Sequence, residues 1–300
     1  MSKINNLVYF LNSMKDTLPF KDEKDFKEKI NKNKDFRIRV QKLVYLSKYF
    51  GWTNAYHFNF HSNGPYSASL SKDYTHIDLN QKNNEEIPNL NIDKLKSFIK
   101  NQNNTLLEAE STLLYYSNMI NIKTLSKNDS INILKSLKPY IPSYCVSESF
   151  DNIVKFNLFN KKVADEKISN VNSLENIVKD KAKSLMDIYE TFDTSSNRLF
   201  ILGSLDYFRV ALKESNLNDI LKFELLKKFY DYSEKIEKDY FKNYSKINKF
   251  AFRDLDNLKN DFNKLEEYVS DELKIIPKFD ETSDLSMFFK GDIHESAYKI

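Results

Sequence analysis

The four histidines are the first residues to examine for chemistry, because imidazole is a common metal ligand and general base near neutral pH. His57 and His61 are four residues apart, the spacing at which a helix brings two imidazoles onto one metal ion. They lie in the segment 56–61, where aromatic and polar residues alternate as in a strand with one buried face. On a strand the two would stand about 13 Å apart, too far to share one ion. The sequence therefore predicts no metal and no cofactor.

Patterns for nucleophiles and phosphate-binding loops are incomplete. Ser69 and Lys72 have the Ser-x-x-Lys spacing of penicillin-binding enzymes, but the chain has no Lys-Thr-Gly partner motif. Cys145 lies outside any catalytic-thiol motif, which favours a packed core cysteine. The four glycines are scattered, whereas phosphate-cradling loops need clustered glycines so that backbone N–H groups can reach the ligand. We therefore expect a protein that is not an enzyme.

The helix that precedes the two histidines has the clearest pattern in the chain. Apolar residues at helical spacing predict a helix over 36–50, with Gly51 at the left-handed position after its end. Arg37, Gln41 and Lys48 are expected on its opposite side, away from the apolar face.

A turn follows the predicted strand. Ser62–Pro65 interrupts the alternation, and Pro65 suits the first turn of a new helix, because its missing N–H would be unpaired there. Ser67 can hydrogen-bond the N–H groups of that first turn. Turn and cap chemistry thus accounts for these residues, and a binding surface on the polar side of the strand and turn is the alternative.

Other helices are predicted along the rest of the chain. A capping box formed by Thr105 and Glu108 opens a core helix, and residues 199–212 are apolar almost all round, as in a helix buried on several sides. Further predicted helices cover residues 3–18, 93–100, 128–138 and 148–160.

The fold class that follows is mainly α with a small β element. A helical N-terminal domain that contains a short strand or hairpin is expected at 1–165. A helical bundle or coiled-coil hairpin is expected at 166–276, and an irregular tail at 277–300.

Apolar residues repeat between 251 and 273 with alternating steps of four and three, as in helices that pack at a shallow angle. The pattern favours a hairpin core within one chain over a seam between two copies, and a homodimer through 251–273 is the alternative. In the tail, Met287, Phe288 and Phe289 could dock onto the body or a partner, but a fraying terminus is the default expectation.

Composition sets further bounds on the protein class. Hydrophobic residues make up 41% of the chain, which is typical of a globular protein. No apolar run is long enough to span a membrane, and the single cysteine fits a reducing compartment, so we expect a cytoplasmic protein without membrane contact. The net charge of +3 is small, so nucleic-acid binding would need a local patch such as Arg37, Arg39, Lys42 and Lys48.

One segment resembles a known family. The pairing of RVQKLVYLSKYFG with NGPYSASLSKDY looks like the signature of the Panacea (SocA-like) domain and of the related YwgA-like proteins, in the N-terminal half only. The matching positions are Gln41, Lys42, Leu43, Tyr45, Gly64, Pro65, Tyr66, Ser67 and Leu70. The resemblance implies an antitoxin-like or adaptor-like protein that binds a protein partner, with a toxin as one candidate.

The leading hypothesis is therefore a non-enzymatic regulatory or interaction protein. Its expected partner-binding residues are Arg37, Gln41, His57, Asn59, His61, Asn63, Tyr66 and Ser67. A dimeric DNA-binding regulator is the first alternative. A hydrolase or nuclease, with acidic residues and histidines converging from distant segments, is the second.

Overall fold

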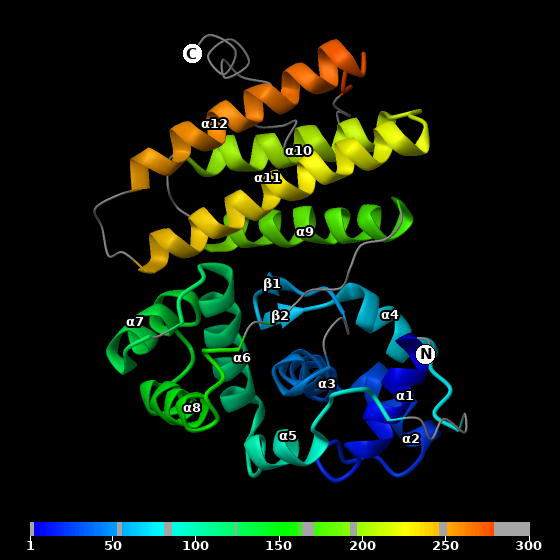
Figure 1. Ribbon diagram of the computed structural model, residues 1–300, viewed down its shortest axis with the longest axis vertical. Helices are drawn as coiled ribbons and strands as arrows, with labels where there is room; N and C mark the ends of the chain where they lie inside the picture. Colours follow the sequence, from blue (N-terminus) through cyan, green and yellow to red (C-terminus); the bar gives the residue numbers. More distant parts are fainter. Residues whose placement is uncertain are drawn as a thin grey trace. The chain divides into compact units, whose positions relative to one another are not determined.

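A computed structural model describes residues 3–52, 56–80, 86–123, 125–161, 163, 171–192, 197–245 and 251–278 (Figure 1). Within these residues the chain forms twelve α-helices and a single two-stranded antiparallel hairpin. The predicted class, mainly α with a small β element, is confirmed. The chain divides into two compact units, residues 1–167 and 168–300.

The first unit contains eight helices and the hairpin. Its helices are α1 (Lys3–Ser13), α2 (Glu23–Lys32), α3 (Lys34–Ser47), α4 (Ala68–His76), α5 (Ile92–Phe98), α6 (Asn104–Met119), α7 (Lys127–Leu137) and α8 (Ser143–Lys155). Its strands are β1 (Asn59–His61) and β2 (Gly64–Tyr66). A 3-10 turn, Lys48–Phe50, extends α3.

Helix α3 is the centre of the first unit and packs against α2, α5, α6 and β2 (Figure 1). Its Tyr45 ring contacts Phe58 and Tyr115, with ring centroids 5.1 and 6.1 Å away. Gly51 closes the helix at φ +110°, where a Cβ would overlap the carbonyl oxygen of Asn89. The predicted helix and its glycine stop are therefore correct, and the surrounding helices bury α3 on most sides.

Several predicted boundaries were wrong. The first helix ends at Ser13, before the expected residue 18, and the N-cap of α6 is Asn103, so Thr105 lies inside the helix. Pro65 lies in β2, and the next helix begins at Ala68 after Ser67. Pro65 pairs with Phe60 in the hairpin, a position that sequence reasoning had assigned to a helix start.

Helix α6 carries a buried carboxyl group that links it to its neighbours. The Glu110 Oε1 atom accepts hydrogen bonds of 2.7 Å from both Gln102 and Asn152. Both donors also reach the carbonyl oxygen of Phe98 at the end of α5. Burial raises the pKa of Glu110 to about 8, against the opposing effect of these bonds. The cluster therefore joins α5, α6 and α8.

The second unit is a helical bundle made of α9 (Val171–Phe192), α10 (Arg198–Glu214), α11 (Asp219–Ser245) and α12 (Ala251–Glu267). A short π-helical turn, Tyr268–Glu272, follows α12. Phe208 is the centre of its aromatic core and stacks on Phe229, with ring centroids 4.6 Å apart. The expected buried helix at 199–212 is α10.

The apolar residues of the seam at 251–273 pack against other helices of the same chain. Leu258, Leu265 and Val269 are buried, and the Phe262 ring packs against Tyr207 and Tyr232 of α10 and α11. This is the intramolecular packing that the spacing favoured. A dimer through the same seam would have to displace these contacts.

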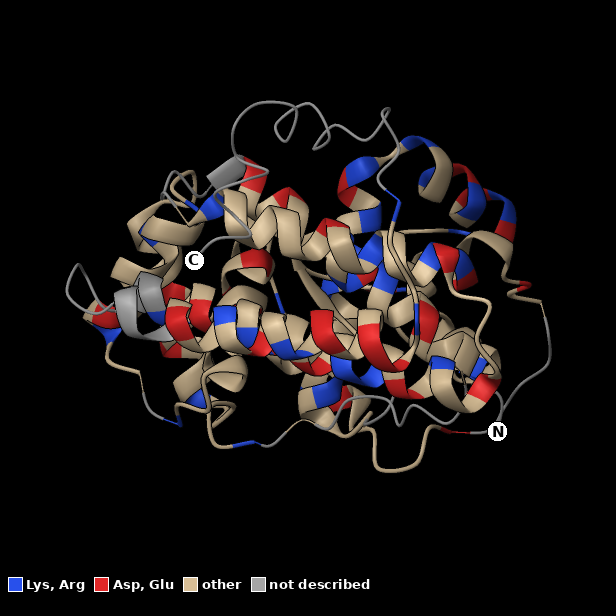
Figure 2. Ribbon diagram, turned by 90° about the horizontal axis from the view of Figure 1, so that it is seen from above, with Lys and Arg blue, Asp and Glu red and all other residues tan. Residues whose placement is uncertain are grey.

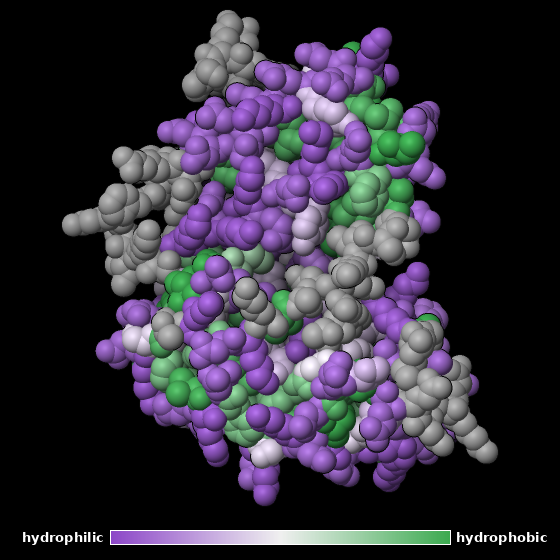
Figure 3. Space-filling view, in the orientation of Figure 1, coloured by the Kyte–Doolittle hydropathy of each residue, from purple (hydrophilic) through white to green (hydrophobic). Residues whose placement is uncertain are grey.

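Surface properties complete the description. Along the helices in Figure 2, Lys and Arg alternate with Asp and Glu, and the face in Figure 3 is mostly hydrophilic, with separate hydrophobic areas. No described helix is both long and apolar enough to cross a membrane. The tail from residue 279 onward, with Met287, Phe288 and Phe289, lies outside the described residues.

Candidate functional site

The β1–β2 hairpin is the part of the first unit in which the expected site residues gather. Its register pairs Asn59 with Tyr66 and His61 with Gly64, which leaves Ser62 and Asn63 as a two-residue turn. Gly64 adopts φ +80°. A Cβ at this position would lie 2.8 Å from Thr112 Oγ1 and 3.1 Å from Lys42 Nζ. Glycine is therefore required both by the backbone conformation and by the close approach of α3 and α6.

Gln41 of α3 binds the end of the hairpin from behind. Its side-chain oxygen accepts from the backbone N–H of Ser67 at 3.0 Å, and its Nε2 donates to the Ser67 carbonyl oxygen, also at 3.0 Å. A further bond of 2.9 Å reaches Ser71 of α4. The Ser67 side chain in turn accepts from the N–H of Leu70 and caps α4, as the sequence predicted. One glutamine thus connects α3, the hairpin and α4.

Lys42 of α3 and Lys48 of the following 3-10 turn are also buried against backbone carbonyl oxygens. Lys42 Nζ donates to the carbonyl oxygen of Pro65 at 2.8 Å, and Lys48 Nζ donates to that of Tyr56 at 3.3 Å. Burial lowers the pKa of Lys42 to about 7, although Glu108 opposes the shift. The expectation that Gln41 and Lys48 face away from the packed side of α3 was therefore wrong, and Lys42 is not placed to contact phosphate. The physical reason is that the hairpin supplies carbonyl acceptors, so long polar side chains can be buried.

A third buried lysine reaches the turn from the end of α7. Lys138, directly after α7, is 1% exposed and donates to the carbonyl oxygens of His61, at 2.9 Å, and Ser62. Its Nζ lies 3.6 Å from Glu108 Oε1. Burial lowers the pKa of Lys138 to about 8, and Glu108 acts in the other direction.

Tyr140 completes the support on the solvent side. Its hydroxyl group donates to the Ser62 carbonyl oxygen at 3.1 Å and also bonds Glu108, while the residue as a whole is 57% exposed. Partial burial and the Glu108 carboxylate raise the pKa of Tyr140. Sequence reasoning did not select Glu108, Lys138 or Tyr140 as site residues.

The eight expected partner-binding residues do not form one exposed surface. Gln41, His57, Asn59 and Ser67 are buried, and His57 and Asn59 contact each other through side chains at 3.1 Å. These four are therefore corrected from partner contacts to interior residues. The expected strand with one polar, accessible side is shorter than predicted, since only residues 59–61 pair in a sheet.

The other four residues remain at least partly accessible. His61, Asn63 and Tyr66 are half-buried, and the rings of His61 and Tyr66 meet edge to face with centroids 4.9 Å apart. Arg37 is also half-buried but lies at the end of α2, where it donates to the carbonyl oxygens of Ile30 and Asn31. It is thus a helix-end contact away from the turn. We name His61, Ser62, Asn63, Tyr66 and Tyr140 the hairpin surface.

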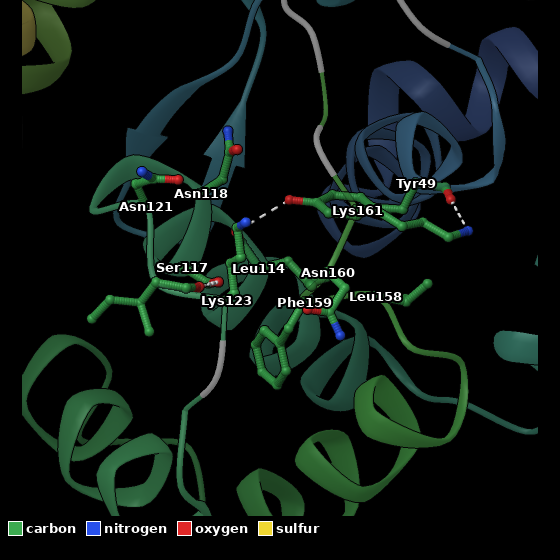
Figure 4. A pocket seen from close by; sticks show the side chains of 11 residues that line it. Tyr49, Leu114, Ser117, Asn118, Asn121, Lys123, Leu158, Phe159, Asn160 and Lys161 are labelled. Carbon is green, nitrogen blue, oxygen red and sulfur yellow. Dashed lines mark hydrogen bonds between the residues drawn. The ribbon is translucent and has the colours of Figure 1, made fainter.

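A small pocket lies elsewhere in the first unit, between the ends of α3, α6 and α8 (Figure 4). Tyr49 donates its hydroxyl proton to the carbonyl oxygen of Leu114 at 3.1 Å, and Lys161 donates to that of Tyr49. The pocket has a volume of about 30 Å³, the share of one water molecule in the liquid. It is too small for an organic substrate.

The lysines buried against the hairpin, Lys42 and Lys138, are hydrogen-bonded to carbonyl oxygens. No group of three or more metal-ligating side chains occurs among the described residues. The hairpin surface offers an aromatic pair, an amide, a hydroxyl and an exposed tyrosine on a fixed backbone, which suits contact with another macromolecule.

Comparisons with protein-family models, with curated proteins and with solved structures gave no match for this chain.

Proposed function

We propose that this chain is a non-enzymatic interaction protein that binds a protein partner through the hairpin surface. The observation that carries the proposal is the support of the turn from behind. The carbonyl oxygens of His61, Ser62, Pro65 and Ser67 all accept bonds from side chains outside the hairpin. Such a turn would keep its conformation before and after binding.

Preorganisation is what makes the support relevant to binding. A flexible loop loses conformational freedom when a partner orders it, and each ordered side chain costs about 0.5–1.5 kcal/mol. A hairpin of three residues per strand is only marginally stable by itself. Fixing it with buried lysines and a glutamine removes most of that cost from the binding step.

The resemblance to the Panacea and YwgA-like group agrees with a division between residues that support the turn and residues that contact the partner. Its motif residues Gln41, Lys42, Gly64 and Ser67 build the support, and the accessible side chains of the turn lie beside them. We therefore extend the proposal to an antitoxin-like or adaptor-like role in the cytoplasm, with a protein partner. Specificity would reside in the hairpin surface and the scaffold in the motif.

The test uses full-length tagged protein expressed in its own cells, with captured proteins quantified by mass spectrometry. Ser62→Lys places a long charged side chain at the exposed tip and should reduce partner capture at least tenfold, while the melting temperature stays unchanged. His61→Ala should weaken capture less, because the backbone of the turn is retained. Ser136→Lys, at an exposed position of α7, is the matched control and should capture the partner normally.

The outcome decides both the surface and the class of partner. Equal capture by Ser62→Lys and Ser136→Lys would remove the hairpin surface from the proposal. A captured protein that stops growth when expressed alone, and does not when co-expressed with this chain, would establish the antitoxin-like role.

A further inference from the structure

The buried carboxyl group of Glu110 has more hydrogen-bonding capacity than its surroundings use. Glu110 is 1% exposed, and its Oε1 atom accepts from the side-chain amides of Gln102 and Asn152. Its Oε2 atom is also buried but has no hydrogen-bond partner among the described residues, and the same holds for Oε1 of Gln102. Buried polar atoms in proteins nearly always have a partner, so these two oxygen atoms require an explanation.

The two side-chain amides have no hydrogen left to offer these oxygen atoms. Gln102 Nε2 donates to Glu110 Oε1 and, at 2.8 Å, to the carbonyl oxygen of Phe98. Asn152 Nδ2 donates to the same two oxygen atoms, at 2.7 and 3.1 Å. Each amide nitrogen carries two hydrogens, so all four are used. Because both acceptors are oxygen atoms, the orientation of the two amides is also fixed.

No positive charge compensates a carboxylate at this position. Glu110 forms no ion pair with any residue that the structure describes. Charged side chains on the surrounding elements have other partners: Arg39 on α3, Lys96 on α5, Glu108 on α6, Lys127 on α7 and Asp151 on α8. The Glu148 carboxylate of α8 does act on Glu110, and its negative charge disfavours a second one nearby. The surroundings therefore favour the neutral, protonated form of Glu110.

We propose that Glu110 is a pH-sensitive latch: as a carboxylic acid it donates its Oε2 proton to Oε1 of Gln102 and holds α5 and α8 against α6, and loss of that proton releases them. In the closed state the Gln102 amide donates to the acid and the acid donates back to the amide. One proton thus gives both oxygen atoms a partner, because a protonated carboxyl group carries a single O–H donor.

Ionisation opens the latch because the charge has no compensation inside the fold. A buried carboxylate without a cation must be hydrated or remain very unfavourable. Glu110 is enclosed, so water reaches it only when α5 or α8 moves away from α6. The Oε2 atom and Oε1 of Gln102 would also lack the hydrogen that joined them.

The direction of the pH effect follows from the proton count of the folded and unfolded states. The folded-state pKa of Glu110, about 8, lies above its ordinary value of 4.5, with burial as the main cause. The folded chain therefore binds more protons between these values. The stability that the closed latch contributes is complete below pH 4.5 and is lost as pH rises through 8.

Infrared spectroscopy of the full-length chain tests the proton itself. A protonated carboxylic acid has a C=O stretching band that is separate from the bands of carboxylates. Subtracting the spectrum of Glu110→Gln from that of the wild-type chain at about pH 6.5, where ordinary carboxyl groups are ionised, should leave one such band. The band should disappear with a midpoint near pH 8. Glu148→Gln should move this midpoint to lower pH, because it removes a negative charge that opposes ionisation.

Hydrogen exchange tests the release of the helices. Glu110→Gln has an amide in place of the acid, so it can still donate to Gln102 but cannot ionise. At about pH 6.5 the amides of α8 should be equally protected in both proteins. At about pH 9.5 they should exchange at least tenfold faster in the wild-type chain than in Glu110→Gln. Comparing the two proteins at the same pH cancels the intrinsic pH dependence of exchange, and α2, which packs on α3 and α4, is the internal reference.

Three results would overturn the proposal. The first is the absence of the carboxylic acid band at pH 6.5, which would mean that Glu110 is ionised inside the fold. The second is equal protection of α8 in the two proteins at both pH values. The third is failure of Glu110→Gln to fold, because the neutral amide should replace the neutral acid without loss.

Discussion

Lys42 in the first unit and Lys181 in the second are buried against different kinds of acceptor. In the first, Lys42 is fully enclosed and donates to the carbonyl oxygen of Pro65. In the second, Lys181 of α9 is 1% exposed and pairs with two carboxylates of α11, Glu234 and Glu237, the latter at 2.8 Å. A carbonyl acceptor fixes the path of the local backbone, whereas a carboxylate pair fixes the position of one helix against another. The first arrangement shapes a surface, and the second holds a bundle together.

The two kinds of acceptor also differ in how well they stabilise a buried positive charge. A carbonyl oxygen carries only a partial charge, so it compensates a buried ammonium group less well than a carboxylate does. The pKa of Lys42 accordingly falls to about 7, with burial as the main cause. Lys42 can donate a hydrogen bond both as an ammonium group and as a neutral amine. The turn therefore remains supported when Lys42 loses its proton.

The largest expected effect is in the second unit. Lys181→Met leaves the buried Glu237 carboxylate without its cation, and breaking a buried ion pair in this way costs about 3–5 kcal/mol of unfolding free energy. Urea denaturation measures the loss. Lys181→Met with Glu237→Met should recover much of it, since the buried Glu237 carboxylate is removed and the remaining Glu234 is partly exposed and also lies near Lys238. A cost below about 1 kcal/mol for the single change would contradict the assignment of a structural ion pair.

The next largest expected effect is the pH dependence of the unfolding free energy that Lys42 of the first unit contributes. The folded-state pKa of Lys42, about 7, lies below the unfolded value of 10.5. The folded state therefore binds fewer protons between these values, and stability rises with pH across that window and falls as pH drops through 7. Relative to Lys42→Met, the wild-type chain should gain about 2–3 kcal/mol between pH 7 and pH 9, at 1.36 kcal/mol per pKa unit. Urea denaturation of both proteins at pH 6, 7 and 9 measures the difference.

The comparison of wild type with Lys42→Met contains an internal control, because the variant has two separate effects on stability. Lys42→Met also removes the donor to Pro65, which costs about 1–3 kcal/mol when the carbonyl oxygen stays buried. That cost is common to all pH values. A difference between wild type and variant that is flat from pH 6 to pH 9 would show that Lys42 keeps an ordinary pKa and would weaken the contrast between carbonyl and carboxylate acceptors.

The smallest effect concerns two glycines, one from each unit. Gly64→Ala should cost about 1–3 kcal/mol, because φ +80° is unfavourable for alanine and its Cβ would meet Thr112 Oγ1 at 2.8 Å. Gly203 lies within α10, where alanine is the better helix former by about 1 kcal/mol. Thermal unfolding should therefore shift down for Gly64→Ala and stay level or shift up for Gly203→Ala. Similar downward shifts for both would show that the turn makes no special demand for glycine.

Helices were the part of the fold that sequence patterns predicted well. The periodic runs that became α3, α10 and α12 bury a face against neighbours, so their apolar spacing is a direct record of packing. Helix starts were less accurate, as for α6 and for the Pro65 region, because several polar residues near a helix start can serve as the cap. β2 was missed, since three residues that include a glycine and a proline carry no strand pattern of their own.

The candidate site was predicted only in part. Three of the expected residues, His61, Asn63 and Tyr66, are accessible and belong to the hairpin surface. The four buried members were misplaced because polar residue types suggest exposure unless an acceptor is known. Lys138 and Tyr140 went unnoticed, since nothing local marks a lysine or tyrosine that will meet a turn far away in the chain.

The sequence by itself determined the helical class and the left-handed position of Gly51. Each of these depends on neighbouring residues or on the conformational freedom of one residue. Only the tertiary structure decided which lysines are buried, because burial of a charge requires acceptors brought from remote segments. Lys138 and the carbonyl oxygen of His61 are 77 residues apart. The fold alone brings them within hydrogen-bonding distance, and with them the support of the turn.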